Sequence, residues 1–331
     1  MITHWITFLL AGLAVVLAGT RLSKFGGAIG QYSGIGQGWI GLLFLATITS
    51  IPELTTTITG ASIGAPDIAV GNALGSNLFN IAIIAVMDLI LLRRGPFLLK
   101  VRSYHLISGG MAIFLTSVAV LGMVLNLRMR LLGIGILSWI ILLGYVYGIF
   151  LLYHAERGGK EGDQVTVDIS LARALAGFIF CAVVIITAGV FLVQASKAIS
   201  IESGLSGSFM GAILVAIVTS LPELATALGA IRIKAYDMIL GNIFGSNMFN
   251  ILTIFFADVA FRQGSILSCP GVGMMDQLVV AILGIGLTVI AIIAIAYRSR
   301  RCVLGVGIDA ALILVFYLIG TYLIISRGIR V

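Results

Sequence analysis

One pattern occurs twice in this 331-residue chain, at a constant offset of 170 residues from Glu53 to Glu223. The first copy reads TSIPE at 49–53 and GNALGSNLFN at 71–80, and the second reads TSLPE at 219–223 and GNIFGSNMFN at 241–250. Each copy places a glutamate within an apolar segment, where an unpaired carboxylate is energetically unfavourable if the segment crosses a membrane. Because this unfavourable feature is present at matching positions in both copies, it indicates a function.

The composition places these segments in a lipid bilayer. Sixty per cent of the residues are hydrophobic, ten per cent are charged and the mean hydropathy is +1.17, whereas soluble proteins contain about 25% charged residues. Ten apolar runs are long enough to cross a hydrocarbon core of roughly 30 Å as helices. The predicted spans are 5–23, 38–62, 68–92, 105–126, 130–153, 171–197, 208–231, 238–261, 275–297 and 303–326. The sequence therefore predicts an all-α integral membrane protein with ten transmembrane helices.

Each copy of the pattern lies in a half with five predicted spans. Because five is odd, the second half enters the membrane from the opposite side, which produces the inverted repeats found in many transporters. We predict an N-terminal five-helix repeat at 1–153, a cytoplasmic linker at 154–170 and an inverted C-terminal five-helix repeat at 171–331. The repeated motif regions within the two halves are 41–88 and 211–258.

The basic residues predict the orientation of the chain. With the N-terminus outside, 14 of the 20 Lys and Arg residues fall in cytoplasmic loops, and such residues are concentrated on the cytoplasmic side of membrane proteins. We therefore expect a multi-pass protein of the cell membrane (plasma or inner) with both termini outside. This bias accounts for the net charge of +7, and we expect a lipid bilayer around the chain but no nucleic acid, obligatory protein partner or cofactor.

A proline precedes each glutamate and is expected to interrupt a helix. Pro52 and Pro222 have no backbone N–H and disrupt the preceding turn, which frees a carbonyl beside a Thr-Ser pair. Hydroxyl, carbonyl and carboxylate oxygens then lie together, and hard cations such as Ca²⁺ prefer such an oxygen-only set. The alternative is a structural kink in which the hydroxyls bond back to i−4 carbonyls. That alternative does not explain a glutamate in both copies.

The second segment of each copy predicts a polar stripe on the next helix. The stripe residues recur every four positions and so share one helix face; they are Asn72, Ser76, Asn80 and Asn242, Ser246, Asn250. Glycines with small-xxx-small spacing, such as Gly71 and Gly75, allow close helix approach and predict that the stripe lies near the broken helix. Asn80 and Asn250 are the better candidate ligands. For Asn72, Asn77, Asn242 and Asn247, simple packing brackets with interhelical hydrogen bonds stay open as an alternative.

Two further pairs of aspartates match at the 170-residue offset. Asp67 and Asp237 fall where a helix starts, which predicts a capping role. Asp88 and Asp258 lie near helix ends, where we expect interfacial water to solvate them.

Both segments in both copies resemble the α-1 and α-2 repeats of the cation/calcium exchanger superfamily, in particular those of prokaryotic sodium/calcium exchangers. The resemblance implies a mid-membrane Ca²⁺ site flanked by Na⁺ sites and exposed alternately to either side. Carried over by motif, it implies acidic ligands from Glu53 and Glu223, carbonyls from Thr49 and Thr219, hydroxyls from Ser50, Ser76, Ser220 and Ser246, and amide oxygens from Asn80 and Asn250.

Two departures within the superfamily bear on the ions carried. Many prokaryotic members have an aspartate where this chain has Asn250, so the site here has two formal negative charges and the Na⁺:Ca²⁺ ratio stays open. The resemblance also implies that proton/calcium exchangers have a glutamate at the place of Gly75 and Gly245. The glycines favour Na⁺ as the driving ion.

We therefore expect a secondary active antiporter, not an enzyme, that exchanges Na⁺ for Ca²⁺ by alternating access and binds both ions as transported substrates. Sliding of the long first and sixth spans is the expected gating motion. An H⁺/Ca²⁺ exchanger is the nearest alternative. A cation channel is the alternative from another class, and inverted repeats with broken helices argue against it.

Overall fold

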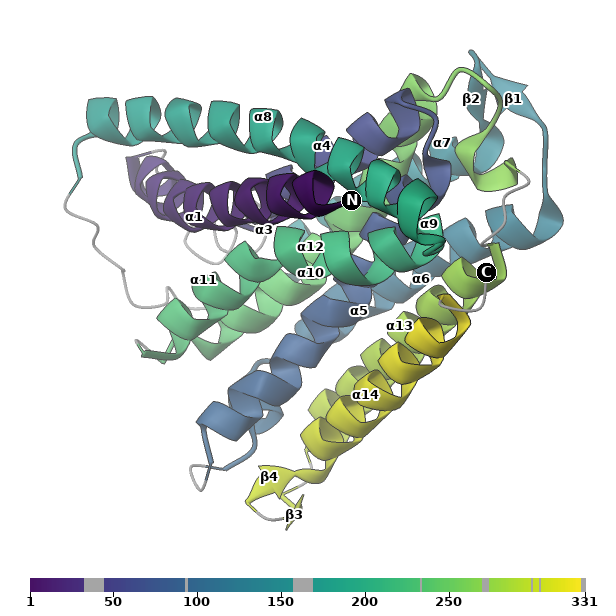
Figure 1. Cartoon of the computed structure of the whole chain (residues 1–331). Coiled ribbons are helices and arrows are strands. Elements are labelled where there is room, and N and C mark those ends of the chain that lie inside the picture. The colour runs from purple at the N-terminus through teal and green to yellow at the C-terminus, as the bar shows by residue number, and fades with distance from the viewer. Residues whose placement is uncertain are drawn as a thin grey trace.

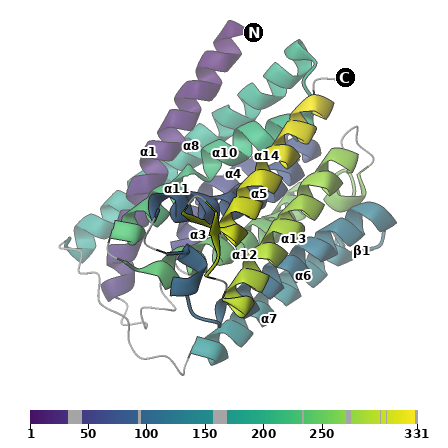
Figure 2. The same ribbon diagram turned by 90° about the horizontal axis from the view of Figure 1, so that it is seen from below.

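The computed structural model describes residues 1–32, 45–92, 95–156, 169–232, 234–269, 274–298, 300–303 and 305–328. The chain forms a bundle of long helices, which Figure 1 shows from one side and Figure 2 shows after a quarter turn. Residues 33–44 and 157–168 are outside the described ranges. The start of the predicted second span and most of the predicted linker therefore lie outside them too.

The first half contains α1 (Ile2–Tyr32), α3 (Ala46–Thr49), α4 (Ile51–Ser62), α5 (Pro66–Ile90), η2 (Phe97–Lys100), α6 (His105–Leu125), β1 (Arg130–Leu131), β2 (Ile134–Gly135) and α7 (Ile136–Glu156). The second half contains α8 (Leu171–Ser203), α9 (Gly207–Phe209), the π-helical segment η3 (Met210–Val215), α10 (Ala216–Thr219), α11 (Leu221–Arg232), α12 (Tyr236–Ala260), η4 (Ile266–Ser268), α13 (Met274–Tyr297), β3 (Cys302–Val303), β4 (Val306–Gly307) and α14 (Ile308–Gly328).

The described ranges confirm the all-helical membrane fold. They contain nine helical segments that are long and apolar enough to cross a membrane, and each overlaps a predicted span. The predicted second span, 38–62, is represented by α3 and α4. The total of ten spans stays a prediction, because this span begins outside the described residues.

Two predicted spans begin too early. Arg130 pairs with Gly135 in a β-hairpin, and Cys302 pairs with Gly307 in a second hairpin. In the first hairpin, Leu132 has a φ of 54°, and such left-handed residues are typical of tight two-residue hairpin turns. These residues are apolar enough to extend a hydropathy window, but their pairing ends the span. Helices α7 and α14 accordingly begin at 136 and 308 rather than at 130 and 303.

The two halves are inverted and exchange contacts. The β1–β2 and β3–β4 hairpins occupy corresponding places in the two halves and lie at opposite ends of the molecule (Figure 1). Gly135 N of the first half donates to Asp258 Oδ2 of the second at 2.8 Å, and Gly307 N of the second half donates to Asp88 Oδ2 of the first at 2.7 Å. This reciprocity is what an approximate two-fold relation between inverted halves produces.

Asp88 and Asp258 are structural, although their places near helix ends suggested solvated carboxylates. Their exposed fractions are 3% and 1%. Besides the hairpin bonds, Asp88 accepts a bond from Phe97 N, whereas Asp258 accepts bonds from Ile266 N and from Ser138 Oγ. Each aspartate therefore fastens the loop after its own helix to the hairpin of the other half.

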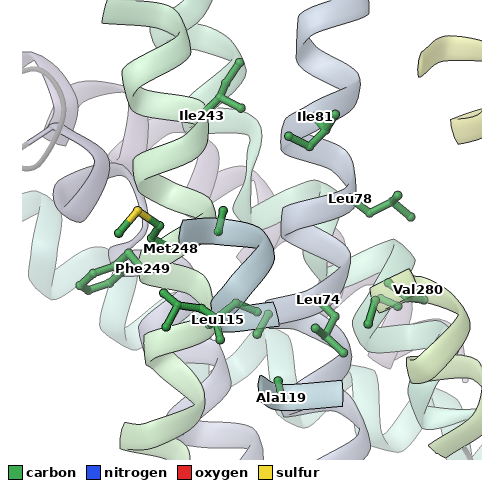
Figure 3. Close-up of a cluster of buried hydrophobic side chains, with 14 of the residues drawn as sticks. Leu74, Leu78, Ile81, Leu115, Ala119, Ile243, Met248, Phe249 and Val280 are labelled. Atoms are coloured by element: carbon green, nitrogen blue, oxygen red, sulfur yellow. The ribbon is translucent and has the colours of Figure 1, made fainter. Parts of the chain in front are cut away.

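The central helices are α5 and α12, which are the most deeply buried of the described spans. Figure 3 shows apolar side chains of both helices together with neighbours from α6 and α13; the labelled residues are Leu74, Leu78, Ile81, Leu115, Ala119, Ile243, Met248, Phe249 and Val280. Helix α5 also approaches η3 so closely that a Cβ atom on Gly75 would lie 2.1 Å from the Ala212 carbonyl oxygen. This contact confirms that the glycines bring α5 against the span that contains α10 and α11.

Helices α1 and α8 pack along each other beside this core (Figures 1 and 2). They contain 31 and 33 residues, more than the predicted spans of 5–23 and 171–197. Their paired arrangement agrees with their equivalent positions at the start of the two halves.

Candidate cation site

Both proline-glutamate segments break a helix at the serine two residues before the proline. Helix α3 ends at Thr49 and α4 begins at Ile51, with Ser50 between them at φ −89° and ψ 11°. Helix α10 ends and α11 begins in the same way around Ser220, which has φ −90° and ψ 4°. The predicted helix interruptions are confirmed, and the two breaks have nearly the same backbone geometry.

The structure buries every predicted site residue. Each of the ten has an exposed fraction of 0%; they are Thr49, Ser50, Glu53, Ser76, Asn80, Thr219, Ser220, Glu223, Ser246 and Asn250. They come from the two helix breaks, the first turns of α4 and α11, and the polar stripes of α5 and α12.

Hydrogen bonds join each glutamate to the helix break of the opposite half. Ser220 Oγ donates to Glu53 Oε1 at 2.8 Å, and Ser50 Oγ donates to Glu223 Oε1 at 3.1 Å. Ser246 Oγ adds a bond to Glu223 Oε1 at 3.3 Å. The two carboxylates therefore lie at the interface between the halves, and each accepts a hydrogen bond from the serine at the helix break of the opposite half.

The threonines of the breaks contact the polar stripe of the opposite half. Thr49 Oγ1 donates to Asn242 Oδ1 at 3.2 Å, and Thr219 Oγ1 donates to Asn72 Oδ1 at 3.1 Å. Thr219 Oγ1 also lies 3.5 Å from Ser76 Oγ. For Asn72 and Asn242, the role of interhelical bracket is thus the one that the hydrogen bonds show.

Asn77 and Asn247 bracket α5 and α12 directly. Asn77 Nδ2 donates to Asn247 O at 3.1 Å, and Asn247 Nδ2 donates to Asn77 O at 3.3 Å. Asn80 Nδ2 donates to Asn247 Oδ1 at 3.1 Å. The sequence repeat gives the matched positions of these residues but not this pairing.

Four buried oxygens of the predicted ligands have no hydrogen-bond partner among the described residues. They are Glu53 Oε2, Glu223 Oε2, Asn80 Oδ1 and Asn250 Oδ1, one carboxylate and one amide oxygen from each half. Nor does any ion pair within the described ranges involve either glutamate. Buried acceptors without donors are unfavourable, whereas hard cations take carboxylate and amide oxygens as ligands.

Sequence reasoning did not assign Ala46 and Ala216 to the site. The Ala46 carbonyl oxygen lies 3.4 Å from Ser246 Oγ and 3.2 Å from Thr49 Oγ1, so it is an alternative acceptor for hydroxyls that also face Glu223 and Asn242. The Ala216 carbonyl oxygen lies 3.2 Å from Thr219 Oγ1 in the same way. These carbonyl oxygens lie among the hydroxyls of the breaks, and the matching of the two alanines at the 170-residue offset was the available signal.

Asp67 and Asp237, which the sequence suggests as helix caps, have a different role. The N-caps of α5 and α12 make no side-chain cap bond. Gln277 Nε2 donates to Asp67 Oδ1 at 3.3 Å. Asp237 Oδ1 accepts a bond from Arg102 N at 2.7 Å and lies 3.1 Å from His105 Nε2. Both aspartates therefore join the two halves at a helix start.

Buried carboxylates on broken helices, at the interface of two inverted halves, define a membrane transporter of cations. A family model described as "Sodium/calcium exchanger protein" matches residues 3–155 and 173–324. The chain belongs to this family.

Relatives match most of the chain. It is 30% identical over 261 residues to the inner membrane protein YrbG of Escherichia coli, covering 77% of this chain and 78% of the relative. It is 28% identical over 266 residues to the putative antiporter CaxA of Alkalimonas amylolytica, covering 75% and 77%. Identity to the sodium/calcium exchanger MaX1 of Methanosarcina acetivorans is 26% over 288 residues, covering 77% and 82%.

Two solved structures show the same fold. The H⁺/Ca²⁺ exchanger CAX matches with a TM-score of 0.72 at 14% identity, covering 98% of this chain and 85% of that one. The sodium-calcium exchanger NCX_Mj matches with a TM-score of 0.59 at 22% identity, covering 97% and 98%. Because these two exchangers use different driving ions, the shared fold does not distinguish Na⁺ from H⁺.

Proposed function

We propose that this chain is a secondary active antiporter that exchanges Na⁺ for Ca²⁺ by alternating access. Glu53 and Glu223 hold Ca²⁺ between the two helix breaks, with hydroxyl, amide and carbonyl oxygens completing the ligand set. The observation that carries the proposal is the set of four buried, unpartnered oxygens on Glu53, Glu223, Asn80 and Asn250. A cation among them would satisfy acceptors that the described protein groups leave without donors.

Competition for the two carboxylates couples the ions. Two carboxylates neutralise one Ca²⁺ or two Na⁺, so the same oxygens hold one cargo or the other. An empty site leaves two unneutralised carboxylates buried at membrane depth, which is unfavourable. The halves therefore rearrange readily only when the charge of Glu53 and Glu223 is neutralised, and this requirement prevents uncoupled movement.

The surroundings of Gly75 support Na⁺ rather than H⁺ as the driving ion. The resemblance to the superfamily implies a glutamate at that place in proton/calcium exchangers, whereas here even a Cβ atom would lie 2.1 Å from the Ala212 carbonyl oxygen. A glutamate at position 75 would require α5 and η3 to move apart. The chain thus lacks the additional carboxylate and packs a helix contact in its place.

We further propose that the protein lies in the cell membrane with both termini outside, as the distribution of basic residues predicts. Sliding of α1 and α8 against the central helices would expose the site alternately to the two sides. The pairing of these two long helices beside the core supports this motion (Figures 1 and 2).

The test is ⁴⁵Ca²⁺ uptake into vesicles that contain the purified protein and are loaded with Na⁺. Dilution into Na⁺-free buffer drives uptake by wild type, and Glu53→Gln or Glu223→Gln abolishes it because each removes one of the two charges. Glu202→Gln is the matched control, since Glu202 contacts Met1 N and His4 at 2.6 and 3.2 Å, apart from the proposed ligand set. Near-normal transport by both site variants would contradict the assignment.

The same vesicles separate the alternatives. Uptake driven by a pH gradient without Na⁺ would identify an H⁺/Ca²⁺ exchanger. Flux that needs no counter-ion and does not saturate would identify a cation channel.

A further inference from the structure

A backbone carbonyl in the core fixes the orientation of an amide side chain. Asn77 O can only accept a hydrogen bond, so the group that Asn247 presents to it at 3.3 Å must be the Nδ2 end of its amide. The other end of the same amide, Oδ1, then faces Asn80. Asn247 is 1% exposed and lies within the core, so water does not compete for this contact.

The orientation is passed on to a proposed ion ligand. Because Asn247 presents an oxygen, Asn80 must present its Nδ2 end, and these two atoms are 3.1 Å apart. Asn80 Oδ1 is thereby turned to the other side, where it is buried and has no partner among the described residues. Without Asn247, either end of the Asn80 amide could face the site.

We propose that Asn247 is a positioning residue that turns the amide of Asn80 so that its oxygen, rather than its NH₂ group, faces the bound cation. The inference rests on the proposed function, because it takes Asn80 as an ion ligand. It assigns a role to a residue that touches no ion and is contributed by the half opposite to the ligand that it orients.

The corresponding hydrogen bond in the other half, between Asn77 and Asn250, is not formed among the described residues. Asn77 is oriented by Asn247 O in the same way, at 3.1 Å, yet Asn77 Oδ1 has no partner in the described part of the chain. Both amide atoms of Asn250 are also without partners there. The amide of Asn80 is thus oriented by a hydrogen bond, whereas that of Asn250 is not oriented by any described residue. This difference provides an internal comparison for the test.

The experiment is a double-mutant cycle on equilibrium ⁴⁵Ca²⁺ binding to the purified protein. Asn247→Ala should raise the Kd for Ca²⁺ about tenfold, the effect of losing one well-oriented buried hydrogen bond. Asn80→Asp replaces the amide by a carboxylate whose two oxygens are equivalent, so orientation no longer matters. That carboxylate has no N–H to donate to Asn247 Oδ1, so in this background Asn247→Ala removes a contact between two acceptors and should leave the Kd unchanged or lower it. The difference from the rise of about tenfold in wild type is strong coupling between contacting residues.

Asn77→Ala is the matched control, because it removes the same side chain from the reciprocal bracket and has no bond to Asn80 among the described contacts. Its effect should be additive with Asn80→Asp. Additive effects of Asn247→Ala and Asn80→Asp would overturn the inference. So would an Asn247→Ala protein whose thermal midpoint falls while its Kd is unchanged, since that is a purely structural effect.

Uptake measurements distinguish a failure of the positioning role from a failure of the proposed antiport function. In Na⁺-loaded vesicles, Asn247→Ala should raise the KM for Ca²⁺ with little change in the maximal rate. If the binding cycle shows coupling but wild type shows no Na⁺-driven uptake, the antiport proposal fails and the positioning role stands. If Glu53→Gln abolishes transport while the cycle is additive, only the positioning role fails.

Discussion

The two halves share a motif but support it differently, and the bracket asparagines of α5 and α12 show this best. The two N–H groups of Asn72 Nδ2 have three acceptors within reach: Thr56 Oγ1 at 2.8 Å, Thr57 Oγ1 at 3.0 Å and the Glu53 carbonyl oxygen at 3.3 Å. Asn242 Nδ2, its counterpart, has no acceptor in the described part of the chain. The first half therefore holds its glutamate-bearing helix against its stripe more firmly than the second does.

The helix starts of α5 and α12 differ in charge. Asp67 accepts its bond from the neutral amide of Gln277, whereas Asp237 lies against two basic side chains, Arg102 and His105. Since the halves are inverted, these clusters lie at opposite ends of the bundle. The proposed ligands of the two halves are the same residue types but have different surroundings, and we expect the two access states to differ in free energy for this reason.

The largest expected effect tests whether the hairpin anchors are equivalent. Asp258→Asn should lower the free energy of unfolding by about 3 kcal/mol, because one end of the amide would present an N–H to a donor and leave it unsatisfied. Asp88→Asn should cost about 2 kcal/mol, since Asp88 has no counterpart of the Ser138 hydroxyl bond among its described contacts. Thermal unfolding in detergent measures both.

Ser138→Ala provides the control for this difference and should bring the Asp258 anchor closer to the Asp88 anchor. Equal losses for the two aspartate variants would show that the Ser138 bond contributes nothing to the asymmetry.

A smaller effect is expected at the helix starts. Asp237→Asn should cost about 2 kcal/mol and Asp67→Asn about 1 kcal/mol, because Asp237 forms an ion pair with the Arg102 guanidinium besides its hydrogen bonds, whereas Asp67 accepts from a neutral amide. Raising the salt concentration should reduce the difference between the two losses, since Asp237 is 33% exposed in its ion pair with Arg102. A larger loss for Asp67→Asn would reverse the comparison.

The smallest effect is expected when a hydrogen-bond acceptor is removed from Asn72 or offered to Asn242. Ala227 stands at the 170-residue offset from Thr57. Thr57→Ala should cost about 1 kcal/mol by removing one acceptor from Asn72, and Ala227→Thr should recover up to about 1 kcal/mol by offering one to Asn242. In Thr57→Ala the unfolding midpoint should fall and the Kd for Ca²⁺ should rise, and in Ala227→Thr both should change in the opposite direction.

Thr57→Ser is the control, since it keeps the hydroxyl and should keep most of the stability. If Ala227→Thr destabilises the protein, steric crowding rather than the missing acceptor distinguishes the halves.

The sequence predicted most of the fold through patterns that need no tertiary information. The long apolar runs and the helix breaks before Pro52 and Pro222 follow from local chemistry. The hairpins at 130–135 and 302–307 were missed, because apolar residues in a turn have the same hydropathy as apolar residues in a helix. The roles of Asp67 and Asp88 were missed for a related reason, since their partners come from other elements.

The sequence by itself determined which residues form the candidate site, because the repeat marks the same oxygen-bearing side chains twice and the bilayer makes them too unfavourable to retain without use. Only the tertiary structure decided how they are oriented. Crossing bonds such as Ser220 to Glu53 join residues from opposite halves, and the direction of an amide such as Asn80 depends on a neighbour 167 positions away. A linear repeat contains the donors and acceptors, but the inverted packing of the halves determines which of them meet.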